Sequence, residues 1–386
     1  MQVLGIDLGT TNSVAAIANH VFPVSDDGRT TMPSVVAFLP NGHTIVGETA
    51  RRRRLIDGQN TIYSSKRIIG RVWNDSRTAT FRDRYPFMMV EGEGGMPLFE
   101  TRSGTFTATQ ISSMILSKVL DCARSIPTEF ETNITVPATF DAAQLAATAE
   151  AGELAGLQHA HLVAEPMATV YAYLSLPREY RRVLVYDLGG GTFDCAVIDC
   201  AGDRPEMLAH SSDLLLGGDD IDQRLADWVA RYVLEKYNWD VTNYAEVQFR
   251  LLARCEEAKI ELSTREETVI ELSQVDPECP DADQGVTVTR TLLEELSDDL
   301  ARRSFVTCDA VLHSSDTKAK DIDSVFLAGG TTLLPFIQEG VRAYFGRPGM
   351  LEFDPTEVVA RGACLTPPED PVRVSGKNKQ GFRKVR

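Results

Sequence analysis

The chain has 386 residues, 43% of them hydrophobic, which is enough for two or three domains with buried cores. A formal net charge of −16 argues against general binding to nucleic acid or to an anionic membrane. Seven scattered cysteines without C-x-x-C spacing indicate neither a disulfide framework nor a zinc site. No apolar run reaches transmembrane length and the N-terminus starts directly with a strand pattern, so we expect a cytoplasmic location.

The first predicted element is a hairpin at the N-terminus. The apolar run 3–6 leads into the stretch 7–13 (DLGTTNS), and the apolar run 14–17 follows. This order reads as strand, turn and strand. The turn contains a glycine and two threonine hydroxyls, which suit contact with phosphate.

The next segment contains a predicted strand at 35–39 and two groups of basic residues. The four arginines at 51–54 fit either an anion or partner patch or a solvated helix face, and the solvated face is the commoner case for such a run. Lys66 lies in the stretch 64–70, and on its residue type alone it reads as an exposed surface lysine.

Two helices and two strands follow. The spacing of apolar residues predicts an amphipathic helix over 107–126, and the alanine-rich stretch predicts another over 142–157. A strand is predicted at 133–137. The run 162–164 leads into Glu165-Pro166, where proline favours the first turn of a helix and the acid lies near the positive end of the helix dipole.

The central stretch repeats the N-terminal plan. The apolar run 183–186 precedes 187–194 (DLGGGTFD), and the apolar run 195–198 follows. Three glycines let the backbone approach an anion, and the two aspartates require a cation or its waters beside a phosphate. This stretch alone also fits a tight turn with exposed aspartates. Because residues 7–13 have the same layout, we predict two similar α/β halves with a nucleotide between them.

The remaining elements continue the second half. Gly217-Gly218-Asp219 precedes a helix, and we expect free N–H groups there to bind phosphate. A helix over 246–263 carries four residues on one face, which without further information reads as solvated. The strand 324–328 is followed by a glycine pair and a helix at Pro335, an order that suits a nucleotide. On the helix predicted over 246–263, the four residues that share one face are Glu256, Lys259, Ile260 and Ser263.

The last predicted helix begins near Asp354 and returns the chain to the first half. Two crossings between the halves make a hinge plausible. The tail after residue 368 is polar and basic, and we expect it to be disordered.

Together these motifs resemble, in order, those of the ATPase domain of the seventy-kilodalton heat-shock chaperones. The resemblance covers about residues 2–365. It rests on 7–13 (DLGTTNS), 29–34 (RTTMPS), 66–71 (KRIIGR), 135–138 (TVPA), 165–166 (EP), 187–194 (DLGGGTFD), 216–219 (LGGD) and 328–332 (AGGTT). It implies an α/β, actin-like ATPase fold with two ribonuclease-H-like lobes around a nucleotide cleft.

The resemblance also implies roles for individual residues. ATP or ADP would bind with Mg²⁺, and K⁺ is a further candidate cation. Lys66, Glu165, Asp187 and Thr192 would act in hydrolysis, and Asp7, Asp187 and Asp194 would hold metal, partly through water. The nucleotide would contact Gly9, Thr10, Thr11, Asn12, Gly189, Gly190, Gly191, Thr192, Gly217, Gly218, Asp219, Glu256, Lys259, Ile260, Ser263, Gly329, Gly330, Thr331, Leu333 and Asp354. Because no arginine finger is visible, we expect slow turnover.

Several positions depart from the family pattern. Leu333 stands where the family usually has an arginine that stacks on adenine, so we expect weaker affinity for the base. Leu145 replaces an arginine that relays the nucleotide state, and His161 replaces one that commonly contacts a J-domain co-chaperone. The linker and peptide-binding domain of the family do not follow residue 366. We therefore expect a stand-alone, monomeric domain that acts on a protein partner or co-chaperone in trans.

The expected domain boundaries are lobe I at 1–180, with a peripheral part at 36–108, and lobe II at 181–348, with a peripheral part at 219–292. Residues 349–368 would return to lobe I, and 369–386 would form the basic tail. Two other classes remain open: a nucleotide-gated binding module with little hydrolysis, and an actin-like filament protein. A sugar-kinase relative fits less well, because no aspartate loop for a substrate hydroxyl can be assigned.

Overall fold

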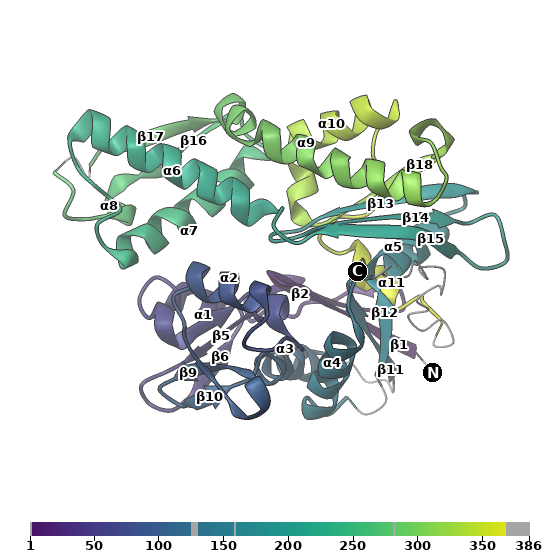
Figure 1. Ribbon diagram of the computed structural model, residues 1–386, viewed down its shortest axis with the longest axis horizontal. Coiled ribbons are helices and arrows are strands. Elements are labelled where there is room, and N and C mark those ends of the chain that lie inside the picture. The colour runs from purple at the N-terminus through teal and green to yellow at the C-terminus, as the bar shows by residue number, and fades with distance from the viewer. Residues whose placement is uncertain (1, 125–129, 158–159, 281–282, 368–386) are drawn as a thin grey trace, which may run out of the picture.

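Two sheets of the same plan form the centre of the computed structural model, which describes residues 2–124, 130–157, 160–280 and 283–367 (Figure 1). In the first sheet the order is β12-β11-β1-β2-β3, with β4 also paired to β2. Its strands are β1 (Gln2–Leu8), β2 (Asn12–Ile17), β3 (His20–Val21), β4 (Thr31–Pro33), β11 (Phe130–Val136) and β12 (His161–Ala164).

The second sheet has the order β15-β14-β13-β18. Its strands are β13 (Arg182–Leu188), β14 (Phe193–Asp199), β15 (Glu206–Asp213) and β18 (Ser324–Ala328). In each sheet an antiparallel hairpin, β1–β2 or β13–β14, has a parallel strand, β11 or β18, beside its first strand. The duplication inferred from the two Asp-Leu-Gly motifs is therefore present in the strand pairing.

Each half has its own hydrophobic core. One buried cluster draws on residues between 4 and 157, and another draws on residues between 184 and 345. We refer to residues 1–180 as the first half and to 181–348 as the second half. In Figure 1 the first half lies below the second.

Smaller elements extend both halves. The first half adds two three-stranded sheets, β5 (Val35–Phe38), β6 (Thr44–Val46) and β7 (Thr61–Tyr63), then β8 (Met88–Glu91), β9 (Pro97–Thr101) and β10 (Gly104–Phe106). It also has the helices α1 (Glu48–Arg53), α2 (Ser76–Arg84), α3 (Ala108–Ala123) and α4 (Ala142–Leu154), and the short 3-10 helix η2 (Ser65–Ile68). The second half adds α6 (Gly218–Tyr237), α7 (Ala245–Leu262), α8 (Leu272–Val275), α9 (Arg290–Ser314), α10 (Pro335–Phe345), the 3-10 helix η5 (Gly330–Leu333), and the hairpin β16 (Glu267–Glu271) and β17 (Gly285–Thr289).

Local sequence explains the helix boundaries. Thr107 caps α3 in a capping box with Gln110, and Asp141 caps α4 with Gln144. The helix predicted to reach residue 157 ends at Leu154, because Gly156 adopts a φ of +86°. The helix predicted over 107–126 ends at Ala123, and residues 125–129 lie outside the described part.

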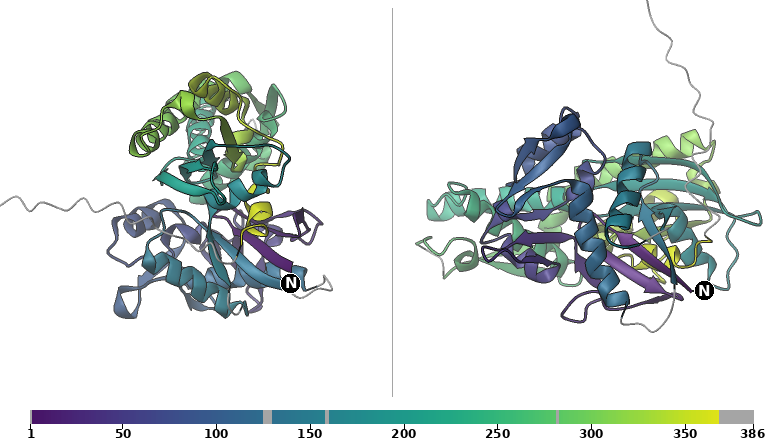
Figure 2. Two further views of the ribbon diagram at one scale, coloured as in Figure 1. Left: turned by 90° about the vertical axis from the view of Figure 1, so that its right-hand side faces the viewer. Right: turned by 90° about the horizontal axis from the view of Figure 1, so that it is seen from below.

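Two helices connect the halves. α5 (Glu165–Leu174) and α11 (Val358–Ala363) pack against each other, and α11 also packs on β1 and β2 (Figures 1 and 2). The contact is close: a Cβ on Gly362 would overlap the carbonyl of Ala168, and a Cβ on Gly5 would overlap the backbone of Cys364. The chain therefore returns to the first half, as the sequence predicts.

Other expectations can be compared with the structure directly. All seven cysteines are free. In the described part of the chain, the helices are too short or too polar to cross a bilayer. The basic tail predicted to be disordered falls outside the described residues.

Candidate functional site

The turns of the two central hairpins face each other across the halves. A Cβ on Gly190 would overlap the hydroxyl of Thr11, so the two turns are in contact. Within the described residues, the N–H groups of Thr10, Thr11, Gly190 and Gly191 have no protein acceptor. Successive free N–H groups in turns form a concave site for an anion. The paired turns can therefore hold phosphate groups.

A pocket opens between these turns. It brings together most of the residues that the sequence assigns to nucleotide, metal and catalysis. They are Asp7, Gly9, Thr10, Thr11, Asn12, Lys66, Glu165, Asp187, Gly189, Gly190, Gly191, Thr192, Asp194, Glu256, Lys259, Ile260, Gly329, Gly330 and Thr331. Residues from six separate stretches thus line one cavity.

Lys66 is buried at the floor of this pocket rather than exposed. It comes from η2 and donates a hydrogen bond from Nζ to Oε1 of Glu165 at 2.7 Å. Glu165 comes from the first turn of α5, so its position follows from the helix start at Pro166. Burial alone would lower the pKa of Lys66, but the carboxylates of Glu165 and Asp7 raise it. The lysine therefore keeps its positive charge inside the pocket.

Three aspartates lie around this ion pair. Burial and the nearby Glu165 raise the pKa of Asp7 to about 6, and Asp7 accepts a hydrogen bond from Thr135 at 3.0 Å. Burial and Glu165 likewise raise the pKa of Asp194 to about 6, and that of Asp187 is raised from its usual value. Burial is the main cause of these raised pKa values, and the crowding of four carboxylates around Lys66 adds to them. A bound cation would offset the negative charge of these carboxylates.

The arrangement also limits how a metal could be held. Across the residues that the structure describes, no group of three Asp, Glu, His or Cys side chains could hold a metal ion directly. Mg²⁺ commonly keeps several waters and binds through one or two carboxylates together with substrate phosphates. The aspartates of the pocket fit that kind of site, with phosphate oxygens and waters completing the coordination.

The outer part of the pocket is formed by α7. Lys259 donates to Asp222 at 2.8 Å, and both side chains are buried. Glu256 also lines the pocket, and Ile260 lies at its surface with 55% of its area exposed. Sequence periodicity suggested a solvated face here. The structure instead turns these three residues of α7 toward the cavity.

The start of α6, with Gly217 as its N-cap, differs from the prediction of a phosphate site. Gly218 and Asp219 donate their N–H groups to the carbonyls of Gly189 and Gly190, at 3.0 and 2.6 Å. The N–H of Gly217 donates to the Asp220 carboxylate at 2.9 Å. These donors are therefore used inside the protein, and the prediction that they are free for phosphate is wrong. Gly218 and Asp219 instead bind the backbone of the glycine hairpin.

Three further predicted residues do not line the pocket. Ser263 follows the last residue of α7, and Leu333 ends η5 with 36% of its area exposed. Asp354 accepts hydrogen bonds from the N–H and hydroxyl of Thr356, at 2.8 and 2.7 Å. The lining includes four residues that the sequence did not single out: Pro137, Pro355, Thr356 and Val359. Pro137 belongs to the TVPA motif and could have been found there.

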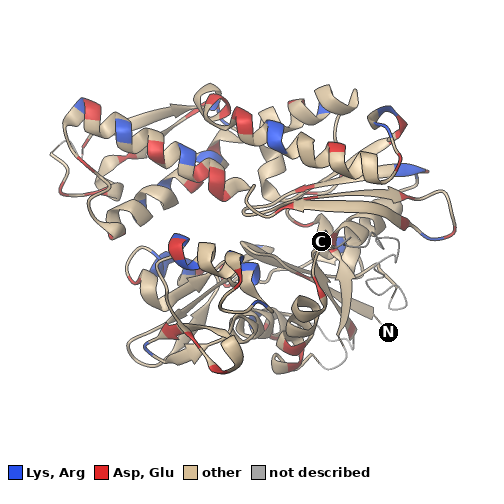
Figure 3. Ribbon diagram, in the orientation of Figure 1, with Lys and Arg blue, Asp and Glu red and all other residues tan. Residues whose placement is uncertain are grey.

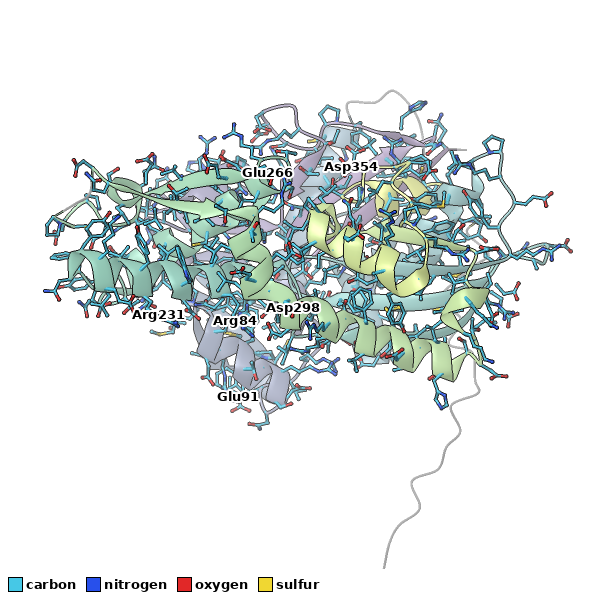
Figure 4. All side chains as sticks on the ribbon, turned by 90° about the horizontal axis from the view of Figure 1, so that it is seen from above. Arg84, Glu91, Arg231, Glu266, Asp298 and Asp354 are labelled. Atoms are coloured by element: carbon cyan, nitrogen blue, oxygen red, sulfur yellow. The ribbon has the colours of Figure 1, made fainter. Side chains whose placement is uncertain are left out.

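The four-arginine run is more than a solvated face. Arg54 reaches across to the second half and pairs with Glu256 at 3.1 Å. Arg84, at the end of α2, pairs with Asp220 at 3.4 Å; Figure 4 labels Arg84 where α2 meets the second half. Figure 3 shows basic residues on the upper side of the first half, below acidic residues of the second. Only Arg52 of the run, with a side chain 77% exposed, fits the prediction well.

The geometry and the family comparison agree. A family model described as Hsp70 protein matches residues 3–367, which is nearly all of the described chain. Proteins of this family have the actin-like ATPase fold, bind ATP or ADP together with metal ions, and work with co-chaperones. Members of the family are ATPases. The chain belongs to the Hsp70 protein family.

Proposed function

We propose that the protein binds Mg-ATP between its two halves and slowly hydrolyses it to ADP and phosphate, and that the state of the cleft controls a partner protein. The observation that supports this most is the pocket itself. It combines two turns with free N–H groups, two buried lysines and five carboxylates from both halves. Phosphoryl transfer needs such positioning and charge compensation more than covalent chemistry.

In this proposal each part of the pocket has a separate task. Thr10, Thr11 and Asn12, with the backbone of Gly189, Gly190 and Gly191, bind the phosphates. Lys66, held by Glu165, stabilises the charge that develops on the γ-phosphate oxygens. Thr192 and Asp187 orient the attacking water. Mg²⁺ supplies charge neutralisation, held by Asp7, Asp187 and Asp194, largely through water.

Slow turnover follows from what the lining lacks. Among the described residues that line this pocket there is no arginine. An arginine that contacts the transferring phosphoryl group is worth about 10³- to 10⁵-fold in rate. We therefore expect a rate suited to a switch rather than to metabolic turnover.

The remaining assignments are also part of the proposal. Glu256, Lys259 and Ile260 would contact the ribose and base, with Gly329, Gly330 and Thr331 on the opposite side of the cavity. The proposed lobes are 1–180 and 181–348, and K⁺ is a candidate for a second cation. The partner, a client or co-chaperone, would respond to opening and closing of the lobes. A pulldown with and without ATP would identify it.

The catalytic assignment can be tested by single-turnover hydrolysis. Lys66→Ala should lower the rate of phosphate release from bound ATP at least tenfold, because it removes the buried positive charge. Lys118→Ala is a matched control: Lys118 pairs with the exposed Asp26 at 2.5 Å, outside the pocket. This control should hydrolyse ATP like the wild type.

Two results would redirect the proposal. Equal hydrolysis by wild type and Lys66→Ala would refute the role of Lys66. ATP binding by calorimetry without any phosphate release from the wild type would instead favour a nucleotide-gated binding module.

A further inference from the structure

Arg67 connects the two halves of the molecule from a position next to Lys66. Its side chain extends from η2 to the second half. The guanidinium donates from Nη1 to the carbonyl of Leu214 at 3.1 Å and from Nη2 to Asp219 at 3.2 Å. Leu214 follows β15, and Asp219 lies in the first turn of α6, so both acceptors belong to the second half. The side chain is 11% exposed. A buried guanidinium with two acceptors has a well-defined orientation, since its donors form a rigid planar fork.

Arg67 also touches the phosphate-binding hairpin. A Cβ added to Gly191 would overlap Nη2 and the central carbon of the Arg67 guanidinium. The third glycine of the motif is therefore needed where this arginine crosses from the other half. Arg67 does not itself line the pocket. Any effect on chemistry must act through its neighbours.

The contacts of Arg67 connect Lys66 to the opposite half. Lys66 and Arg67 are consecutive residues of the same short 3-10 helix. Lys66 is held in the first half by Glu165, whereas Arg67 is held by the second half. The separation between the Lys66 ammonium and the glycine hairpin therefore depends on the contacts of Arg67.

We propose that Arg67 is a positioning residue. In the closed arrangement it sets the distance between Lys66 and the hairpin 189–192, and it must release Asp219 and Leu214 before the cleft opens and nucleotide leaves. This inference rests on the proposed function, because it assumes that the pocket binds ATP and ADP. It adds a residue that the sequence motifs did not assign, although it directly follows Lys66.

Arg71 provides a matched control. It is four residues further along, and its side chain is 14% exposed. It also makes two hydrogen bonds, to Asp141 and Gln144, each at 2.7 Å. Both partners belong to the first half. Loss of Arg71 thus removes a similar pair of contacts without affecting the connection between halves.

The test compares Arg67→Gln with Arg71→Gln in two assays. One follows the release of a fluorescent ADP analogue after addition of excess ATP, and the other follows single-turnover ATP hydrolysis. Arg67→Gln should release the analogue at least tenfold faster and hydrolyse ATP at least tenfold more slowly than the wild type. Arg71→Gln should stay within about threefold of the wild type in both assays. Arg67→Lys, which keeps the charge but loses the fork, should fall between.

A second variant approaches the same contact from the other half. Asp219→Ala should also speed release of the analogue, and the double variant Arg67→Gln with Asp219→Ala should be no faster than Arg67→Gln alone. If Arg67→Gln does not fold, Asp219→Ala and Arg67→Lys are compared with the wild type in the same two assays instead.

The outcomes separate this inference from the proposed function. Wild-type release and hydrolysis by folded Arg67→Gln, or by Asp219→Ala and Arg67→Lys where Arg67→Gln does not fold, would overturn the inference and leave the proposed function intact. Equal effects of Arg67→Gln and Arg71→Gln would also overturn it, since they would indicate only a general loss of stability. A wild-type protein that binds no ADP analogue would contradict the proposed function, and the inference with it.

Discussion

Asp222 is a buried carboxylate beside the pocket, and its ionisation should affect stability. Burial raises its pKa to about 7, although Lys259 opposes the shift. The folded state binds this proton more tightly than the unfolded state does. The contribution of Asp222 to the free energy of unfolding therefore falls as pH rises from about 4 to about 7. The side chain introduced by Asp222→Asn has no ionisable group, so the variant lacks this pH dependence.

We predict that Asp222→Asn gains stability relative to the wild type between about pH 5 and pH 8. Urea unfolding without nucleotide at both pH values measures the two free energies. Parallel changes in both proteins would show that Asp222 titrates normally.

Leu333 tests how the base is held. It ends η5 with 36% of its surface exposed, where the family usually has an arginine stacking on adenine. Leu333→Arg should tighten ATP binding about fivefold, since an exposed cation–π contact contributes about 1 kcal/mol. Calorimetry measures the change. Leu351→Arg is the control: Leu351 is also exposed, at 40%, but Leu333 ends η5, whose residues Gly330 and Thr331 line the pocket, whereas Leu351 is not part of that helix. Equal changes in both variants would contradict a specific contact with the base.

Single residues were the hardest part of the site to predict. On its residue type alone, Lys66 reads as an exposed surface lysine. Its burial depends on Glu165, which is 99 positions away in the chain. The family resemblance, not its residue type, placed it in the pocket. The same limit applies to Arg54 and Arg67, whose acceptors lie in the other half. Local sequence contains no signal for such partners.

Among the secondary-structure elements, α11 is held by close backbone packing. It is wedged between β1 and α5, and a Cβ on Gly362 would overlap the backbone of Ala168. Backbone cannot move aside as a flexible side chain can, so the added methyl should separate the helices.

Overpacking costs about 1–3 kcal/mol, and a clash with backbone belongs at the upper end of that range. The gain in helix propensity offsets about 1 kcal/mol, so Gly362→Ala should lower the free energy of unfolding by about 1–2 kcal/mol. Gly202→Ala is the matched control, since a Cβ there would meet only one atom, at 3.7 Å. Denaturant unfolding compares the two variants. A Gly362→Ala protein as stable as Gly202→Ala would show that α11 can move away from α5 without loss.

The elements themselves were largely predictable. Apolar runs gave the strands of both central hairpins, and apolar spacing and an alanine-rich stretch gave the helices that begin at Ala108 and Ala142. The prediction was wrong before α6, where glycines at a helix start suggested free donors. There the N–H groups of Gly218 and Asp219 bond to the neighbouring hairpin. A sequence shows that a donor exists, but its acceptor depends on packing between elements.

For the whole molecule, the repeated Asp-Leu-Gly motif correctly indicated two related halves around one pocket. The contacts that join them could not be inferred, because they depend on how the halves meet. Three ion pairs in the described residues connect the halves, and in each the arginine belongs to the first half: Arg54–Glu256, Arg67–Asp219 and Arg84–Asp220. These pairs join the two halves on the side where the pocket lies between them.

The central claim is that both halves together bind one magnesium nucleotide. The most direct measurement is the melting temperature of the purified protein with Mg²⁺, with and without ADP or ATP. A ligand that binds only the folded state adds about 2.7 kcal/mol at a hundred times its Kd, so the melting temperature should rise by several degrees. Mg²⁺ alone should produce a smaller rise. A folded protein whose melting temperature is the same with and without either nucleotide would contradict the account.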